Sequence, residues 1–220
     1  MDKRWTRRSF VARGLIFPVA AVVAACNGRF LERLSDTASH QPTPLANAPP
    51  MSNQVLAPTP VCGDDDDDVT LAQTEGPYYT PNTPERSSLL EPGITGTKLI
   101  VSGYVLATTC TPIPRVLIDF WHCDASGVYD NAGYKLRGHQ FTDDQGRYIL
   151  ETIVPGIYPG RTRHIHVKVQ AQNQPILTTQ LYFPDEPTNA TDGIFNPALT
   201  MSVQDAADGK LATFNFVLAI

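Results

Sequence analysis

Short runs that alternate apolar and polar residues fill the C-terminal two thirds of the chain. Val116, Ile118 and Phe120 occupy every second position of one such run, a period of two that predicts a strand with one buried face. No stretch between residues 70 and 220 keeps the 3.6-residue period of a long bundle helix. The pattern therefore predicts an all-β fold, an antiparallel β-sandwich of about eight strands. The expected strands are residues 98–107, 115–123, 147–153, 164–170, 176–183 and 211–219.

The N-terminal residues follow a different pattern. A basic segment with Arg7 and Arg8 leads into an apolar run at residues 15–25, which ends at Cys26. This run is shorter than the roughly 20 residues that a membrane-spanning helix needs, and the layout is typical of a signal peptide. The arginine pair resembles a twin-arginine signal, and the residues up to Cys26 resemble a lipobox. We therefore expect residues 1–26 to be a twin-arginine-like lipoprotein signal peptide with Cys26 as its lipidation site.

An ordinary signal peptide with an incidental cysteine is the alternative. Both interpretations predict export. With the lipobox, the protein would be a periplasmic or outer cell-surface lipoprotein that meets the membrane only through its lipid anchor.

Residues 27–69 are expected to form a disordered linker, because they are rich in proline and lack hydrophobic periodicity. The five consecutive aspartates at residues 64–68 belong to this linker, since contiguous carboxylates repel one another into an extended chain and do not cage a cation. Residues 70–220 remain as one domain of ordinary size.

Composition narrows the choice of partners. The chain has 17 basic and 22 acidic residues and a formal net charge of −5, so it lacks the basic surface that a nucleic-acid partner requires. Its 19 prolines and 15 glycines agree with short strands joined by turns.

Two histidines and two tyrosines are the first candidate chemistry. His164 and His166 lie two positions apart in a predicted strand, so both side chains face the same side and can reach one metal ion. A His-x-His pair alone is a weak signal. Tyr158 lies in the turn before this strand, and Tyr129 follows the strand that ends near residue 123, so four donors are available.

The segments that carry these residues resemble the intradiol ring-cleavage dioxygenases. Within that family the chain is most similar to the protocatechuate 3,4-dioxygenase beta-subunit-like branch, because it lacks the N-terminal helical dimerisation region of the catechol 1,2-dioxygenases. The resemblance covers nearly all of the predicted domain. The matching segments are residues 74–79, 121–129, 137–138, 142–143, 155–166 and 179–183.

The resemblance implies one non-haem Fe(III) per chain, held by Tyr129, Tyr158, His164 and His166. Phenolate and imidazole donors suit hard, oxidised iron. Tyr158 would be the axial ligand that the substrate displaces, and Arg161 would be the active-site arginine. The substrate-binding residues that the resemblance implies are Gly76, Pro77, Tyr78, Tyr79, Arg161 and Gln180.

The implied reaction uses O2 to open the ring of a catechol-type substrate between its two hydroxylated carbons, giving a muconate-type diacid. Tyr158 would take a substrate proton, and Arg161 would stabilise negative charge. Members of the family often form oligomers, so a homo-oligomer is possible. Two other functions stay open, namely a non-catalytic exported β-sandwich binding module and a periplasmic Cu or Zn protein, but neither needs two tyrosine ligands.

Two features leave questions open. Only five residues separate Tyr158 from His164, where well-studied branches of the family carry a longer insertion. The pocket could therefore be more open to large catechols, or exchange of Tyr158 could be perturbed. Without Cys26, the cysteines number three, which predicts one disulfide and one free thiol. Cys110 and Cys123 would lie at opposite ends of a hairpin, so Cys62 is the expected partner of one of them.

Overall fold

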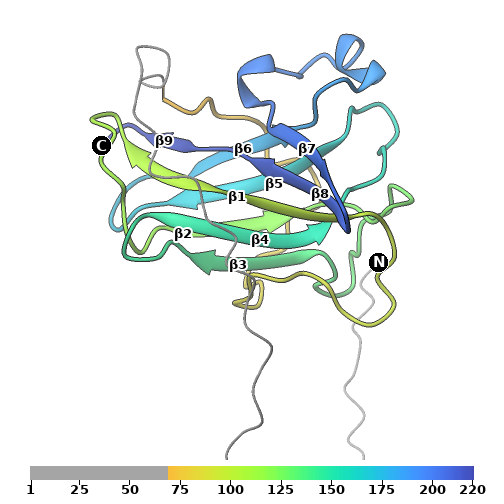
Figure 1. Ribbon diagram of the computed structural model, residues 1–220, viewed down its shortest axis with the longest axis horizontal. Coiled ribbons are helices and arrows are strands. Elements are labelled where there is room, and N and C mark those ends of the chain that lie inside the picture. Colours follow the sequence, from red (N-terminus) through yellow and green to blue (C-terminus); the bar gives the residue numbers. More distant parts are fainter. Residues whose placement is uncertain (1–68) are drawn as a thin grey trace, which may run out of the picture. The chain divides into compact units, whose positions relative to one another are not determined.

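The computed structural model describes residues 69–220, which belong to one compact unit built almost entirely of strands (Figure 1). The predicted all-β sandwich is confirmed, with nine strands in the described residues in place of about eight. The strands are β1 (Lys98–Ala107), β2 (Leu117–Trp121), β3 (Arg137–Phe141), β4 (Arg147–Ile153), β5 (His164–Gln170), β6 (Leu177–Tyr182), β7 (Ser202–Ala206), β8 (Gly209–Thr213) and β9 (Phe216–Leu218), with short 3-10 helices η1 (Pro187–Ala190) and η2 (Pro197–Leu199) between β6 and β7.

The predicted signal peptide (residues 1–26), its lipidation site Cys26 and the linker up to residue 68 lie outside the described residues. From residue 69 onward, no helix has the length and apolar character needed to cross a membrane.

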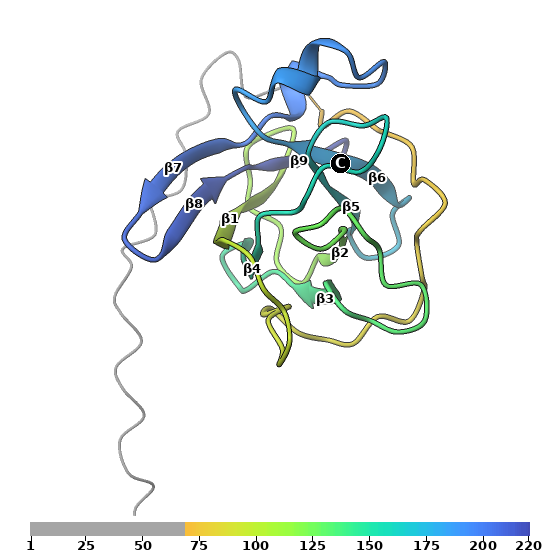
Figure 2. The same cartoon turned by 90° about the vertical axis from the view of Figure 1, so that its right-hand side faces the viewer.

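Two sheets face each other, as Figure 2 shows from the side. One has the order β4-β1-β8-β7, with β9 also paired to β1, and the other has the order β3-β2-β5-β6. All pairs are antiparallel except β1 with β8 and β1 with β9, which are parallel. The antiparallel prediction therefore holds for most of the sandwich, and β1 is the exception because two later strands run beside it in its own direction.

The single strand expected at residues 211–219 is divided into β8 and β9 at Phe214 and Asn215. Where the chain passes Gly103 in β1, a Cβ atom on that glycine would lie only 1.8 Å from the carbonyl oxygen of Phe214. Asn215 accepts a hydrogen bond from the amide of Tyr104 at 3.0 Å through its side chain. The regular pairing with β1 is thus interrupted at these two residues, although the Phe214 amide still donates to the Ser102 carbonyl at 3.1 Å, and it resumes at Phe216.

The core lies between the sheets. Val116, Ile118 and Phe120 are fully buried there, as the period of two predicts. On the opposite face of β2, Asp119 and Trp121 are buried as well, because residues 70–90 cross this sheet. We call this segment the strap. Two of its backbone amides hydrogen-bond to the sheet. The Gln73 amide donates to the Thr178 carbonyl, and the Arg86 amide donates to the His139 carbonyl.

The sequence pattern missed β3 and β7. β3 reads Arg-Gly-His-Gln-Phe, and β7 is mostly exposed with only Val203 partly covered. Neither alternates apolar and polar residues, so their strand pairing is decided by their neighbours rather than by their own pattern.

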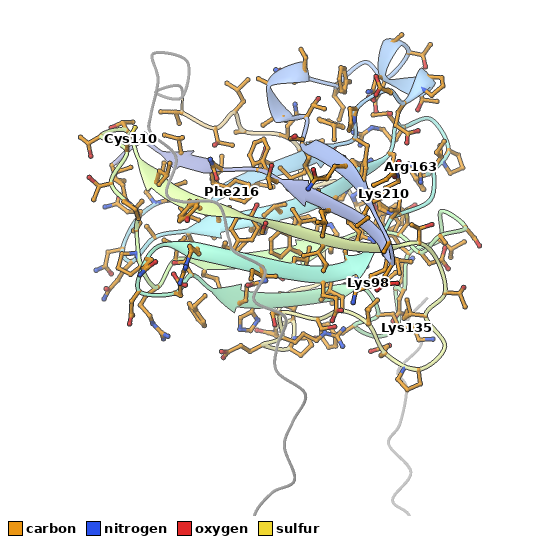
Figure 3. The ribbon with its side chains drawn as sticks, in the orientation of Figure 1. Lys98, Cys110, Lys135, Arg163, Lys210 and Phe216 are labelled. Carbon is orange, nitrogen blue, oxygen red and sulfur yellow. The ribbon has the colours of Figure 1, made fainter. Side chains whose placement is uncertain are left out.

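The cysteines agree with one disulfide and one free thiol. Cys110 is disulfide-bonded, whereas Cys123 is a free, buried thiol. Cys62 lies outside the described residues, so its pairing stays a prediction. Figure 3 shows Cys110 at the end of the sandwich opposite to Arg163, which precedes β5.

His122 links the two sheets. Its Nδ1 lies 2.7 Å from the carbonyl oxygen of Cys123 and its Nε2 lies 2.7 Å from the hydroxyl of Thr152. Because a carbonyl oxygen only accepts, Nδ1 carries the proton and Nε2 accepts from Thr152. Burial lowers the pKa of His122 to about 4, so the ring is neutral in the folded protein at neutral pH.

This burial predicts a pH dependence of stability for the protein without a bound metal ion. The unfolded chain binds the His122 proton at about pH 6.5, above the folded value, so stability is complete above that pH and falls toward pH 4 by about 1.4 kcal/mol per unit for this residue. Urea unfolding at pH 7, 6 and 5 measures the slope. His122→Gln should give a shallower slope, and equal slopes for the two proteins would contradict the assignment.

Candidate active site

The start of β5 brings two imidazole rings together. His164 and His166 are both buried, and their Nε2 atoms lie 3.1 Å apart. Two ligand atoms at about 2.1 Å from one metal ion, at a right angle, would be about 3.0 Å apart. The distance between the two nitrogens therefore fits shared coordination of a single ion.

The surroundings of the two rings fix their charge. The Nδ1 of His164 donates to the carbonyl oxygen of Thr162 at 2.6 Å, which leaves Nε2 with its lone pair. His166 stacks on Trp121 with ring centroids 4.8 Å apart and planes 5° from parallel. Burial lowers the pKa of His164 to about 4, and burial followed by repulsion from His164 lowers the pKa of His166 well below its usual value. Both rings are neutral at neutral pH, the form that binds metals.

Tyr129 and Tyr158 come from two loops that pack backbone against backbone. Gly127 has φ +82°, and a Cβ atom there would lie 2.4 Å from the carbonyl oxygen of Ile157. Gly156 donates its amide to the Asp124 carbonyl at 2.8 Å. With this contact in place, the ring centroids of Tyr129 and Tyr158 are 5.9 Å apart, and the ring centroids of Tyr129 and His166 are 6.3 Å apart. The four predicted metal ligands thus gather at one end of the sandwich.

Tyr129 is protonated when no cation is bound. Burial raises the pKa of its hydroxyl above the usual value. A phenolate at this position therefore needs a positive ion beside it.

The strap lies over the two tyrosines. Gly76 has φ +71°, and a Cβ atom there would come within 3.3 Å of His166 Cε1, so only glycine lets the backbone rest against this ring without adjustment. Pro77 follows, and then Tyr78 stacks on Tyr129 at 4.4 Å. The Tyr78 hydroxyl lies 2.8 Å from the Tyr158 hydroxyl, and this bond raises the pKa of Tyr78.

Tyr79 points to a different place from Tyr78. Its hydroxyl donates to Asp119 at 3.1 Å, its ring packs on Trp121 at 4.8 Å, and the Lys168 ammonium lies 3.6 Å from the ring centre. Burial, followed by the charge of Asp119, raises its pKa to about 12. Tyr79 thus contacts the outer face of β2 and packs against the cluster that contains Trp121 and Tyr129, and its role in substrate binding stays a prediction.

Arg161 and Gln180 are brought together beside the histidines. The Arg161 amide donates to the Tyr158 carbonyl at 3.0 Å, a tight turn that keeps both residues in one site. One terminal nitrogen of Arg161 donates to Gln180 Oε1 at 2.6 Å. Gln180 in turn donates to the Thr74 carbonyl at 2.8 Å, so it joins the strap to the arginine.

Sequence reasoning missed Asp192 and the part that Arg137 plays. Asp192 pairs with Arg161 Nε at 2.8 Å. Arg137 is fully buried and donates to the carbonyl oxygens of Asp130 and Tyr78. Its guanidinium lies 6.0 Å from the centre of the Tyr129 ring. Arg137 was noted only within a motif, and Asp192 lies outside any predicted strand, so the sequence carries no local signal for either contact.

A cavity of about 280 Å³ has Tyr129 in its wall. Its lining also includes His122, Asp124 and Lys135, but not Tyr158, Arg161, His164 or His166. Of the four predicted metal ligands, this cavity therefore reaches Tyr129 alone.

A family model described as "Dioxygenase" matches residues 74–219, which is most of the described domain. The chain belongs to the intradiol ring-cleavage dioxygenase family. Among curated relatives, it is 28% identical over 148 residues to catechol 1,2-dioxygenase of Candida albicans, covering 54% of this chain and 49% of that protein. It is 32% identical over 118 residues to the protocatechuate 3,4-dioxygenase beta chain of Burkholderia cepacia, covering 46% and 50%. The chain spans about half the length of these relatives.

Solved structures of the family share the fold. The dioxygenase domain of a dioxygenase and carbohydrate-binding protein fusion from Streptomyces sp. SirexAA-E is 55% identical with a TM-score of 0.68, covering 70% of this chain and 99% of that one. The 3-chlorocatechol 1,2-dioxygenase of Rhodococcus opacus 1CP is 28% identical with a TM-score of 0.63, covering 68% and 72%.

The buried contacts of Arg137 predict its effect on stability. Arg137→Met should lower the free energy of unfolding by roughly 2–4 kcal/mol, because the carbonyl oxygens of Asp130 and Tyr78 lose a charged donor. Arg147→Met, which removes an exposed pair with Asp143, should cost less than about 1 kcal/mol. Urea unfolding of both variants makes the comparison, and equal losses would refute the role of Arg137.

Proposed function

We propose that this protein is an Fe(III)-dependent intradiol dioxygenase that opens a catechol-type ring between its two hydroxylated carbons with O2, giving a muconate-type diacid. The observation that carries the proposal is the 3.1 Å separation of two neutral imidazole nitrogens at the end of the sandwich that also holds Tyr129 and Tyr158. Membership of the intradiol family supports it.

The donor set fits oxidised iron. Tyr129, Tyr158, His164 and His166 would hold the ion through two phenolate oxygens and two imidazole nitrogens, a combination that suits a hard cation better than thiolates do. Among residues 69–220, no group of three or more His, Cys, Asp or Glu side chains is placed to hold a metal ion. An ion held by the two histidines would therefore take the tyrosines as its further donors, a set that favours iron over the copper or zinc alternative.

Bound iron would act as a Lewis acid that lowers the pKa of the catechol hydroxyls. The residues around it have separate tasks. Tyr158, in the phenolate form that a bound cation would favour, could take a substrate proton on its phenolate oxygen, and the Tyr78 hydroxyl, 2.8 Å from that oxygen, is placed to hydrogen-bond to it. Arg161 can stabilise negative charge that develops on the substrate oxygens. Gly76 and Pro77 bring the strap close enough to limit the pocket on this side.

The turn after Tyr158 supports an entrance to the site that is open to solvent. Gly160 has φ +81°, and a Cβ atom there would meet nothing within 4 Å. Ile157 and Val128 are both well exposed on the neighbouring loops. This arrangement favours access for catechols with large substituents.

We also propose that the enzyme works outside the cytoplasm as a lipoprotein exported by the twin-arginine pathway. This rests on the sequence of residues 1–26 alone.

The visible spectrum tests the metal site. Iron-loaded protein should show a broad tyrosinate-to-iron absorption band that shifts when catechol or protocatechuate is added without oxygen. Tyr129→Phe should weaken the band, because one phenolate donor is lost, whereas Tyr134→Phe should keep it, since Tyr134 bonds to Pro81 away from the site. A wild-type protein that stays colourless after iron loading would overturn the proposal.

Ring opening tests the role of Arg161. With a catechol substrate, Arg161→Gln should lower kcat by roughly 100-fold, as expected when a preorganised charge is removed from a developing anion. Oxygen uptake and the absorbance of the diacid product measure the rate. Arg115→Gln is the control, because Arg115 stacks on Phe141 ahead of β2, at the end of that strand remote from Trp121. A similar loss in both variants would speak against a catalytic arginine.

A further inference from the structure

Asp192 is a buried carboxylate that no motif of the sequence singles out. It lies between η1 and η2, and its side chain is only 2% exposed. Burial alone would raise its pKa, but the amides of Thr162 and Ile194 and the Arg161 guanidinium hold the pKa of this carboxyl below its usual value. Asp192 is therefore charged in the folded protein.

Both oxygens of Asp192 are fully engaged. Oδ2 accepts from Arg161 Nε at 2.8 Å and from the Thr162 amide at 2.7 Å. Oδ1 accepts from the Ile194 amide at 3.0 Å. An ionised carboxylate can accept all three bonds, whereas an amide side chain would turn a donor toward at least one of the N–H groups.

The bond to Arg161 sets the direction of its guanidinium. Nε faces Asp192, and one terminal nitrogen faces Gln180 at 2.6 Å and the Tyr182 hydroxyl at 3.4 Å. In the described part of the chain, the other terminal nitrogen has no hydrogen-bond partner. Because the guanidinium is planar, fixing two of its nitrogens also fixes where the third one points.

The bond to Thr162 reaches one of the histidines. Thr162 is fully buried, and its hydroxyl lies 2.6 Å from Asn189 Oδ1 and 2.9 Å from the Thr188 hydroxyl. Its carbonyl accepts from His164 Nδ1 at 2.6 Å. The segment 188–192 thus holds Thr162 through its amide and hydroxyl, and the carbonyl of the same residue orients the His164 ring.

We propose that Asp192 is the positioning residue of this site: one carboxylate aims Arg161 at the substrate and, by holding the amide of Thr162, fixes the residue whose carbonyl orients the His164 ring. The inference rests on the ring-cleavage function proposed above. Partners that orient a metal-binding histidine typically change metal affinity about 10- to 100-fold when they are removed.

A neighbouring ion pair supplies the matched control. Glu186 lies in the same connection between β6 and β7 and pairs with Arg163 at 2.6 Å. It is also largely buried, but it contacts neither Arg161 nor Thr162 in the described residues. Asp192→Asn and Glu186→Gln therefore make the same chemical change at two comparable ion pairs.

Turnover of the full-length, iron-loaded protein gives the first test. Asp192→Asn should lower kcat at least about tenfold, and Glu186→Gln should change it less than about twofold, because only Asp192 holds the catalytic arginine. In an Arg161→Gln background, Asp192→Asn should lower kcat by less than about a further twofold, since residues that act through each other are not additive. A fully additive loss would overturn the inference.

Iron affinity gives a second test that does not depend on turnover. In competition with a chelator, Asp192→Asn should raise the iron dissociation constant at least about tenfold in both backgrounds, and Glu186→Gln should leave it unchanged. Unchanged affinity in Asp192→Asn would overturn the link to His164. If the wild type binds iron but opens no catechol ring, the proposed function fails, and this comparison alone decides the role of Asp192.

Asp192→Glu covers the case in which the asparagine variant does not fold. It keeps the charge but moves the carboxylate by one methylene. Both kcat and the affinity for iron should therefore fall, as they should in Asp192→Asn. Wild-type values for both quantities in Asp192→Glu would contradict a positioning role.

Discussion

The register of β5 in its sheet is the constraint on which the whole site depends. His166 lies opposite Trp121 of β2 and Gln180 of β6, and His164 lies opposite Tyr182. A slip of one residue would turn both histidines to the core face of the sheet. The apolar residues Ile165, Val167 and Val169 prevent this, because all three are fully buried in the core between the sheets. The same alternation that builds the core therefore directs both imidazole rings to the opposite face.

The side chains predicted to bind the metal are uncharged until a cation binds. The imidazoles are neutral, and Tyr129 keeps its proton until a cation arrives. Two arginines lie near the donors. Arg161 is partly exposed and paired with Asp192, whereas Arg137 is fully buried and, within the described residues, donates to backbone carbonyl oxygens, with the charges of Asp130 and Asp119 acting on it. The charge of each arginine is therefore met by carboxylates or carbonyl oxygens, and the phenolate form of Tyr129 still needs a cation.

The sequence pattern predicted the strands whose own residues alternate between apolar and polar. The bounds expected for residues 98–107, 147–153 and 164–170 agree with β1, β4 and β5, because each run has its own apolar alternation. β3 and β7 have no such alternation, and the break between β8 and β9 depends on the close approach of Gly103 to Phe214, which no pattern within residues 211–219 records.

Candidate site residues divide in the same way. The shared face of His164 and His166 follows from strand geometry alone. Tyr129 and Tyr158 needed the family resemblance, because the two loops meet only in the folded chain. Asp192 was not predicted at all, since its contact with Arg161 joins residues 31 positions apart.

The contact between Gly127 and Gly156 has a consequence for how such enzymes can diversify. Because these two loops touch through their backbones, neither can take an insertion before Tyr129 or Tyr158 without moving a predicted metal ligand. The turn at Gly160 is exposed, but its two ends are tied together, because the Arg161 amide donates to the Tyr158 carbonyl at 3.0 Å. Extra residues that loop out of this turn into solvent would leave Tyr158 and Arg161 in place as long as they keep this hydrogen bond, so the entrance can change in length while both ends of the turn stay fixed.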